Sequence, residues 1–347
     1  MPAEILDMIF DNIDFVTIQI VRKVCRHLRN HIDHFPPDSK LVNVTVKRLN
    51  QQPNLTQDES ISVMYLTKNL QKFDVEYQKN GKNGCRILYG NREKTIENQD
   101  FASVIGNDLG LILRNQNSEM TTITIYFPTL SKLRLSENCL ETFHGRFIAA
   151  LTPHMESRRT PIQTKQIEVY GTNQEYGTNQ ESQIMKILQF FDPSSLESIM
   201  ILFDKQPGFA SPTMKIDRLI GLEQWKQAKS ITIHGLNLAS NIENFSHLES
   251  FAIELKQISG EELVTLKEKI IHRPSLVKRF TINYRHLKDP SPFTSVFVEP
   301  GPWEYTAWFN VPNNIENALR IRWHPKQKWF VFECRKRMIA AQGTIFN

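Results

Sequence analysis

The second half of the chain alternates short apolar segments of strand character with amphipathic segments of helical character. The strand-like segments are residues 166–170, 196–203, 230–234, 248–255 and 277–284, and the helix-like segments are 182–191, 222–228 and 260–272. Successive strand-like segments begin about twenty to thirty residues apart, which is the period of leucine-rich-repeat-like solenoids. The sequence therefore predicts an α/β fold built as an irregular leucine-rich-repeat-like solenoid. A compact α/β layer is the alternative, because the strict Leu-x-x-Leu-x-Leu signature is missing.

The start of the chain carries the clearest helical pattern. Apolar residues recur at three- and four-residue spacing, first over residues 5–13 and then over residues 18–32, and Pro36-Pro37 ends the pattern. A segment of this length seldom sustains a core of its own. Its apolar stripes are therefore expected to pack on something else. The periodicity leaves open whether that is another protein or the rest of this chain.

The amino-acid sequence of this segment resembles an F-box. The resemblance is carried by the string Pro2-x-Glu4-Ile5-Leu6-x-x-Ile9-Phe10-x-x-Ile13-Asp14, then by Ile18, and then by Arg22-x-Val24-Cys25-Arg26-x-Leu28-Arg29. Met1 stands where the family has Leu, and Leu28 where it has Trp, so both positions stay apolar. The resemblance implies a three-helix module that docks on a Skp-type adaptor and, through it, on a cullin. The adaptor-binding residues that it implies are Pro2, Ile5, Leu6, Ile9, Ile13, Val24 and Leu28.

Several strings in the second half look like the FTH domain of nematode F-box proteins of the F-box A family. The most specific is LEQWKQAK at 222–229, and IENFSHL at 242–248 agrees with it. Trp225, inside the first string, is predicted to face the core. Together the two resemblances imply four regions: an F-box at 1–40, a β-rich connecting region at 41–107, an FTH domain at 108–289 and C-terminal capping strands at 290–347.

The rest of the chain predicts further strands, helices and loops. Strands are expected at 41–46, in a hairpin over 73–89, at 121–127 and, as closing strands, at 308–311, 319–323 and 328–332, with helices at 108–116 and 139–156. The polar stretch 51–60 is predicted to be a loop. The tandem repeat of YGTNQE over 170–181 is predicted to be a lengthened surface loop, because extra loop length costs little closure entropy.

The composition is that of an ordinary soluble protein. Apolar residues make up 40% and charged residues 23% of the chain, and no run approaches the roughly 18 apolar residues of a membrane span. Acidic Glu4 and Asp7 disfavour an export signal, so a cytoplasmic or nuclear location and no membrane partner are expected. The four cysteines form no Cys-x-x-Cys pair, and no phosphate-binding glycine motif occurs, so no metal and no other cofactor is predicted. His27, His31 and His34 are expected to be exposed polar residues, because a metal site would need further ligands.

No catalytic constellation is recognisable in the sequence, so the chain is predicted not to be an enzyme and to have no catalytic residue. The expected function is that of a substrate-recognition subunit of an SCF-type (Skp-cullin-F-box) ubiquitin ligase. It would bind the adaptor through the F-box and an unknown target protein through the FTH domain, for ubiquitin-dependent degradation. A non-degradative protein-interaction module is the first alternative. A nucleic-acid binder that uses Trp323, Trp329 and the basic residues near them is the second, and the modest net charge of +5 disfavours it.

Overall fold

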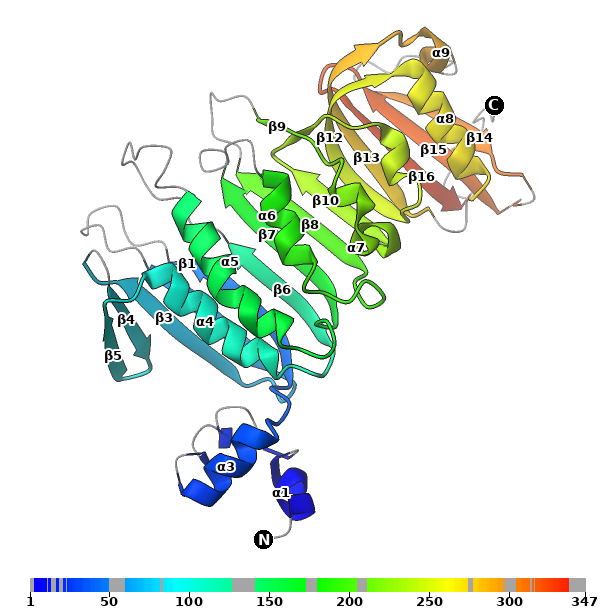
Figure 1. Ribbon diagram of the computed structural model, residues 1–347. Helices are drawn as coiled ribbons and strands as arrows, with labels where there is room; N and C mark the ends of the chain where they lie inside the picture. Colours follow the sequence, from blue (N-terminus) through cyan, green and yellow to red (C-terminus); the bar gives the residue numbers. More distant parts are fainter. Residues whose placement is uncertain are drawn as a thin grey trace. The chain divides into compact units, whose positions relative to one another are not determined.

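The computed structural model describes residues 3–10, 12–13, 17–18, 21–22, 24–49, 60–81, 84–126, 141–172, 180–204, 211–273, 277–295, 297, 304–312, 314 and 316–336 (Figure 1). The chain divides into two compact units. Unit 1 is Met1–Glu175 with Lys186–Leu196, and unit 2 is Tyr176–Met185 with Glu197–Asn347. The boundary between the units falls inside helix α6 (Gln180–Leu188). Both units combine helices with a sheet, so the α/β class predicted from the sequence is confirmed.

Unit 1 holds an N-terminal helical segment followed by a mixed sheet. Its elements are α1 (Ala3–Phe10), α3 (Arg26–His34), β1 (Leu41–Arg48), β2 (Ser60–Thr67), β3 (Lys72–Lys79), β4 (Gly84–Tyr89), β5 (Arg92–Glu97), α4 (Phe101–Arg114), β6 (Met120–Tyr126), α5 (Glu141–Glu156) and β7 (Thr164–Thr172). The strand order is β5–β4–β3–β2–β1–β6–β7. Neighbours from β1 to β5 are antiparallel, whereas β1, β6 and β7 run parallel.

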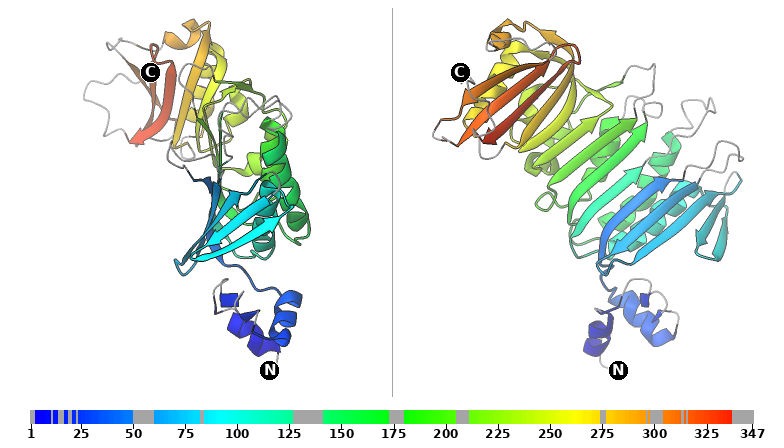
Figure 2. Two further views of the ribbon diagram at one scale, coloured as in Figure 1. Left: turned by 90° about the vertical axis from the view of Figure 1, so that its left-hand side faces the viewer. Right: turned by 180° about the vertical axis from the view of Figure 1, so that it is seen from behind.

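Helices α4 and α5 lie side by side over one face of the unit 1 sheet (Figures 1 and 2). They approach closely because Gly106 of α4 has no side chain: a Cβ there would lie 2.3 Å from the carbonyl oxygen of Phe147 in α5. Ile105, Leu109 and Leu151 are buried beneath the pair. From behind, in the right panel of Figure 2, the strands face the viewer, and none of the described helices of unit 1 covers them.

The N-terminal segment contains a break that the apolar pattern did not predict. The pattern indicated one continuous helix over 18–32, which is wrong: Cys25 is extended, with φ −153° and ψ 164°, and α3 begins after it. In a continuous helix Ile18 and Ile32 would lie about 21 Å apart along the axis. The break brings both into one small core, where their exposed fractions are 2% and 5%.

Unit 2 is built on parallel strands that continue into an antiparallel group. Its elements are β8 (Ser198–Asp204), β9 (Thr213–Met214), η2 (Leu219–Gly221), α7 (Glu223–Gln227), β10 (Ser230–His234), β11 (Asn237–Leu238), η3 (Ile242–Phe245), β12 (Ser250–Ser259), α8 (Gly260–Ile271), β13 (Arg279–Lys288), α9 (Ser291–Thr294), β14 (Tyr305–Asn310), β15 (Asn317–His324) and β16 (Trp329–Lys336). The strand order is β8–β10–β12–β13–β16–β15–β14. The first four of these strands are parallel, and β13, β16, β15 and β14 are antiparallel neighbours.

A row of aromatic rings ties the short helices of unit 2 to its parallel strands. Trp225 of α7 meets Phe245 edge-on at 5.7 Å between ring centroids, Phe245 lies 5.6 Å from Phe251, and Phe251 stacks on Phe280 at 4.2 Å. The indole of Trp225 is 1% exposed. The prediction that Trp225 belongs to the core is therefore confirmed, and the row spans β12 and β13.

Most strand predictions are confirmed, and the misses have physical reasons. The segments 166–170, 196–203, 230–234, 248–255 and 277–284 coincide with β7, β8, β10, β12 and β13, and the three closing strands with β14, β15 and β16. β5 was missed because five of its six residues are exposed, so it shows no alternation. Helix α4 begins at Phe101 rather than 108, because the Asp100 side chain caps it by accepting from the Ser103 amide at 2.9 Å.

Two predicted loops fall wholly or mostly outside the described residues. Of the polar stretch 51–60 only Ser60 is described, and it opens β2, a strand that the sequence did not predict. Residues 173–179 of the tandem repeat are likewise outside. The loop predictions for these segments therefore stay predictions.

Gly235, in the turn after β10, gives a direct test of the unit 2 architecture. Its φ is +78°, and a Cβ there would lie 2.0 Å from the carbonyl oxygen of Phe203. Gly235→Ala is expected to lower the free energy of unfolding by about 2 kcal/mol or more. Gly221→Ala is the matched control, because a Cβ at Gly221 meets no atom within 4 Å. Denaturant unfolding of both variants measures the difference, and equal stability of the two would contradict the described turn.

Candidate protein-interaction surface

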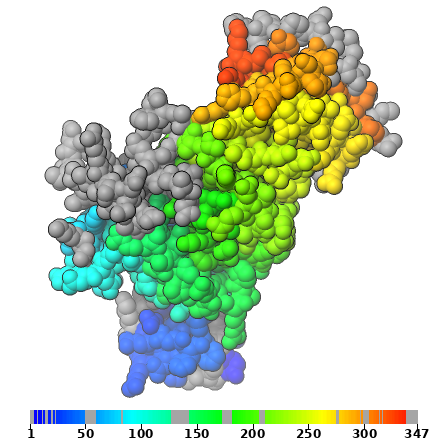
Figure 3. All heavy atoms as spheres, turned by 45° about the horizontal axis from the view of Figure 1, so that its top comes forward, coloured from blue at the N-terminus to red at the C-terminus, as the bar shows by residue number. Residues whose placement is uncertain are grey.

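Exposed large apolar side chains gather in the N-terminal module, defined here as residues 3–40. Of the eight such side chains among the described residues, five belong to this module: Ile5 (48% exposed), Met8 (67%), Ile9 (42%), Val24 (69%) and Phe35 (64%). Figure 3 shows the module as one block of blue spheres. Because monomeric proteins seldom leave apolar side chains clustered in water, such a concentration is typical of a protein-interaction site.

Helix α1 is apolar on two sides. Leu6 and Phe10 point inward and are each 2% exposed. Ile5, Met8 and Ile9 are spaced three and four residues apart, which places them together on the outer side of the helix. These three residues form what we call the apolar ridge. A surface helix normally needs only one apolar stripe, so the ridge is a second stripe that the module's own core leaves uncovered.

A small core under the ridge holds the module together. Its buried members are Leu6, Phe10, Ile18 and Ile32, and the partly buried side chains packed on them are Ile13, Val21 and Leu28. His31 of α3 stacks on Phe10 at 5.7 Å and contacts Phe35 at 5.4 Å. The ridge therefore stands on a packed base.

An exposed ion pair joins the break region to α3. Arg22 Nε donates to Asp33 Oδ1 at 2.6 Å, and the hydrogen bond and the charge of Arg22 hold the pKa of Asp33 below its ordinary value. Both side chains are more than 40% exposed, at 45% and 41%, so the pair contributes at most about 1 kcal/mol.

The exit from the module is anchored by backbone hydrogen bonds. Directly after Pro36-Pro37, the Asp38 carboxylate accepts from the amides of Asn117 and Ser118 at 2.8 and 3.0 Å. The buried side chain of Gln116 exchanges two bonds with Leu41 at the start of β1, at 2.9 and 3.1 Å. These contacts join the module's last residues to the turn between α4 and β6.

The predicted adaptor-binding residues fall into three groups. Ile5, Ile9 and Val24 are exposed, Ile13 and Leu28 are partly buried against the small core, and Leu6 is buried inside it. Pro2 lies outside the described residues. Leu6 thus supports the ridge from beneath rather than presenting its side chain to a partner.

Sequence reasoning missed two exposed apolar residues, Met8 and Phe35. Met8 follows Ile5 by three residues, and this spacing was a usable signal, but Leu6 and Phe10 dominated the pattern. Phe35 follows the last residue of α3, where no helical period identifies it. Both extend the apolar surface of the module.

Two cysteine thiols in the described part of the chain have raised pKa values. Burial raises the pKa of the Cys85 thiol to about 12 and that of Cys334 to about 11, so both thiols stay protonated at neutral pH and are poor nucleophiles. Within the described ranges, no group of three His, Cys, Asp or Glu side chains is placed to hold a metal ion. The same part of the chain contains no helix whose length and apolar character would suffice to cross a bilayer.

Two family models match this chain. The F-box domain model matches residues 1–40, and the FTH domain model matches residues 146–301. No enzyme family is among the matches. Searches of curated proteins and of solved structures gave no match. The F-box match coincides with the module that carries the apolar ridge, and it indicates an adaptor role through protein–protein interaction.

The small core and the exposed surface of the module are expected to respond differently to truncation. Ile32→Ala removes a buried side chain and should destabilise the module by about 2–5 kcal/mol. Val24→Ala, at a residue 69% exposed, should change stability by less than about 0.5 kcal/mol. Hydrogen exchange of the α1 and α3 amides in the full chain measures both. Loss of protection in the Val24 variant alone would show that the core is misassigned.

Proposed function

We propose that this chain is the substrate-recognition subunit of an SCF-type ubiquitin ligase and a member of the nematode F-box A family. In this role the F-box binds a Skp-type adaptor, the adaptor joins it to a cullin, and the FTH domain binds a target protein. The observation that carries the proposal is the apolar ridge of Ile5, Met8 and Ile9 on the very segment that matches the F-box model.

The ridge suits a stable protein contact on energetic grounds. Full burial of an aliphatic side chain of this size contributes about 1.5–3 kcal/mol. Association costs roughly 4–15 kcal/mol in lost freedom, so the ridge needs help from further apolar contacts. Val24 and Phe35 supply candidates in the same module. Because α1 rests on a packed core, little ordering cost remains to be met on binding.

The regions of the chain divide the work in this proposal. Residues 1–40 dock on the adaptor, 41–107 connect, 108–289 form the target-binding FTH domain as a leucine-rich-repeat-like solenoid, and 290–347 cap it. The solenoid is supported by the parallel register of unit 2, where the strands align Ser198, Ser230, Ser250 and Arg279. The strand face away from the helices is the surface proposed for the target.

The chain contributes proximity rather than chemistry. A receptor that holds a target beside the ubiquitin-transfer machinery turns an encounter between separate molecules into a nearly intramolecular one. In this role no side chain of the protein needs to take part in bond making. A cytoplasmic or nuclear location follows from the proposed complex.

The ridge provides the test of the adaptor contact. Ile5→Asp with Ile9→Asp places two charges on the outer side of α1 and should weaken binding of a purified Skp-type adaptor about a hundredfold or more, because each carboxylate would be buried without a partner. Ile13 is unsuitable for this purpose, since it also packs on the small core. Isothermal titration or surface plasmon resonance with the full chain gives the affinity.

Leu70→Asp and Tyr89→Asp are the matched controls, because both residues are exposed, at 80% and 38%, and lie outside the module. They should bind the adaptor as the unmodified chain does. An unchanged affinity of the Ile5 and Ile9 double variant would refute the docking surface. A complex purified from cells that contains the adaptor but no cullin would favour a non-degradative interaction module.

A further inference from the structure

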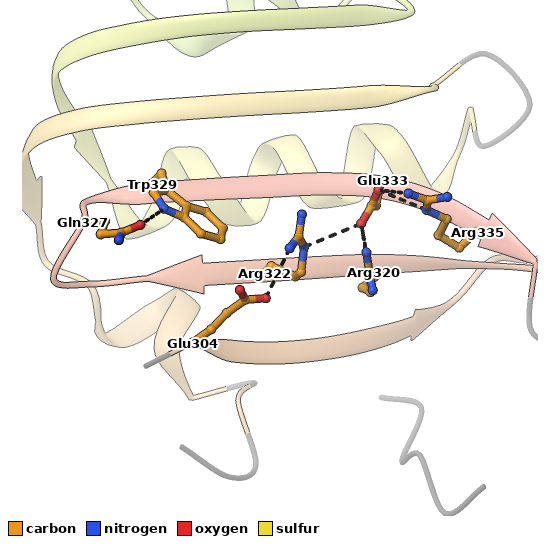
Figure 4. Close-up of polar contacts among 7 residues, drawn as sticks. All are labelled: Glu304, Arg320, Arg322, Gln327, Trp329, Glu333 and Arg335. Atoms are coloured by element: carbon orange, nitrogen blue, oxygen red, sulfur yellow. Dashed lines mark hydrogen bonds and ion pairs between the residues drawn. The ribbon is translucent and has the colours of Figure 1, made fainter. Parts of the chain in front are cut away.

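The face of the unit 2 sheet turned away from its helices carries charged side chains near the C-terminal end. On β16, Phe330 and Phe332 contact Phe293 of α9, at 5.5 and 6.0 Å between centroids. Successive residues of a strand point to opposite faces, so Glu333 and its cross-strand partner Arg320 lie on the other face. Figure 4 shows this arrangement: the side chains of Arg320, Arg322, Trp329, Glu333 and Arg335 lie in front of β15 and β16, and a helix runs behind these strands.

Glu333 is enclosed by guanidinium groups. Its side chain is only 2% exposed. Arg320 donates through Nε at 2.8 Å and through Nη2 to Oε1, and Arg335 donates through Nε and Nη2 to Oε2 at 3.0 and 2.8 Å. Arg322 brings its Nε to 3.6 Å from Oε1 and its Nη1 to 3.6 Å from Glu304. We call Arg320, Arg322 and Arg335 the guanidinium cluster.

The cluster keeps an excess of positive charge. Burial alone would raise the pKa of Glu333, but the hydrogen bonds and charges of Arg320 and Arg335 outweigh burial and hold its pKa below the ordinary value. Glu333 is therefore ionised at neutral pH. It and Glu304 together balance two of the three guanidinium charges, so one positive charge remains at the cluster.

Two indoles hold guanidinium groups in place. Arg320 lies over the ring of Trp308 at 5.7 Å, and Arg322 lies over Trp329 at 5.5 Å. Trp329 is itself fixed by a hydrogen bond from its Nε1 to Gln327 at 2.9 Å (Figure 4). Because the guanidinium planes are already oriented, a ligand would lose little free energy in ordering them.

Several donors of the cluster have no hydrogen-bond acceptor among the described residues. Each guanidinium offers five N–H bonds. Arg320 and Arg335 each donate to Glu333 through Nε and Nη2, so the Nη1 group of each makes no hydrogen bond to Glu333. The buried Nε of Arg322 has no hydrogen-bond partner in the described part of the chain. A second acceptor group at this face would complete the set.

A groove adjoins the cluster and carries the same sign of charge. Its cavity volume is about 500 Å³, and it is lined by residues that include Lys278, Arg279, Glu333 and Arg335. Arg279 is exposed, and among the described residues the ion pairs of Glu333 are with Arg320, Arg322 and Arg335 and not with Arg279. The positive surface therefore continues from the cluster along the ends of β13 and β16.

We propose that the guanidinium cluster and Arg279 bind an acidic segment, rich in Asp and Glu, of the protein that the receptor presents for ubiquitination. This inference rests on the proposed function and names the chemical class of its target. A carboxylate can match a guanidinium edge through two parallel hydrogen bonds. On Glu333 each carboxylate oxygen instead accepts from both Nε and Nη2 of one arginine, which shows that these guanidinium edges face a carboxylate. A peptide lying across the strands would reach both the cluster and the groove.

A nucleic acid fits this face less well. Trp323, which a nucleic-acid site would have used, lies on the helix-covered face, where its Nε1 donates to the Tyr284 hydroxyl at 3.0 Å and its ring stacks on Phe330. Trp329 is in contact with His324 and Arg322, so it offers no open platform for a base.

The test uses the full chain and a short fluorescein-labelled peptide of Glu and Ser, with fluorescence anisotropy as the readout. Arg322→Gln with Arg335→Gln should weaken peptide binding about tenfold or more, while Arg320 stays on Glu333. Arg279→Gln removes a cation that makes no ion pair with Glu333 in the described part of the chain, so it should weaken binding as well and guards against a folding artefact. Arg322→Lys with Arg335→Lys keeps the charge but loses the paired donors, and should restore only part of the affinity.

Lys226→Gln with Lys269→Gln is the matched control, because these exposed lysines carry the same charge on α7 and α8, away from the strand face. The control should bind the peptide within about twofold of the unmodified chain. An equal loss in the control, or no peptide binding at all, would overturn the proposal. Tighter binding of a single-stranded RNA that displaces the peptide would assign the face to nucleic acid instead.

Adaptor binding measured on the same preparations separates this inference from the proposed function. If the unmodified chain binds the adaptor but not the peptide, the receptor role stands and the acidic target is rejected. Peptide binding by a chain that does not bind the adaptor rejects the receptor role and leaves the acidic site in place.

Discussion

Burial of one sheet face beneath helices is the constraint on which each unit of this protein depends. In unit 1, α4 and α5 supply the cover, and the contact is close enough that Gly106 has no room for a side chain. In unit 2, the row from Trp225 to Phe280 performs the same task across parallel strands. Among the described residues, helices lie on one face of each sheet. The opposite face of the unit 2 sheet is the one proposed above for binding.

The N-terminal module is held together differently, because it has few residues from which to build a core. Its chain turns sharply at Cys25 so that Ile18 and Ile32 meet Leu6 and Phe10. That arrangement uses only the inner side of α1. Ile5, Met8 and Ile9 remain in water on the outer side. An exposed apolar stripe on a rigid helix is costly for an isolated protein and favourable for one that is normally covered, which agrees with the F-box match over the same residues.

The buried Glu333 shows how a polar cluster can serve a surface. A carboxylate taken out of water is costly unless several donors satisfy it. Here Arg320 and Arg335 each donate two hydrogen bonds to it, and Arg320 and Arg322 lie over the indoles of Trp308 and Trp329. The carboxylate thus orients more positive charge than it neutralises. The guanidinium cluster therefore presents N–H donors in fixed directions, whereas lysines at the same positions would present flexible point charges.

Local periodicity was sufficient for much of the fold. The alternation of strand-like and helix-like segments predicted β7, β8, β10, β12 and β13, and apolar alternation near the C-terminus predicted the three closing strands, because one buried face per element leaves a readable period. It failed where that condition fails: β5 is exposed on both sides, and the first turn of α4 depends on a cap rather than on apolar spacing.

For the site, the sequence by itself determined that residues 5–13 are apolar at helical spacing and that Trp225 belongs inside. Only the tertiary structure decided that Leu6 is buried while Ile5 and Ile9 are exposed, since both sides of α1 are apolar and spacing cannot rank two equivalent faces. The hydrogen bonds between the guanidinium cluster and Glu333 could not be predicted from the sequence either. Arg320 reaches Glu333 only because the register of β15 and β16 places the two residues opposite each other. The spacing of apolar residues shows which side chains could be buried. Residues distant along the chain decide which of those side chains are buried, because they supply the atoms that cover them.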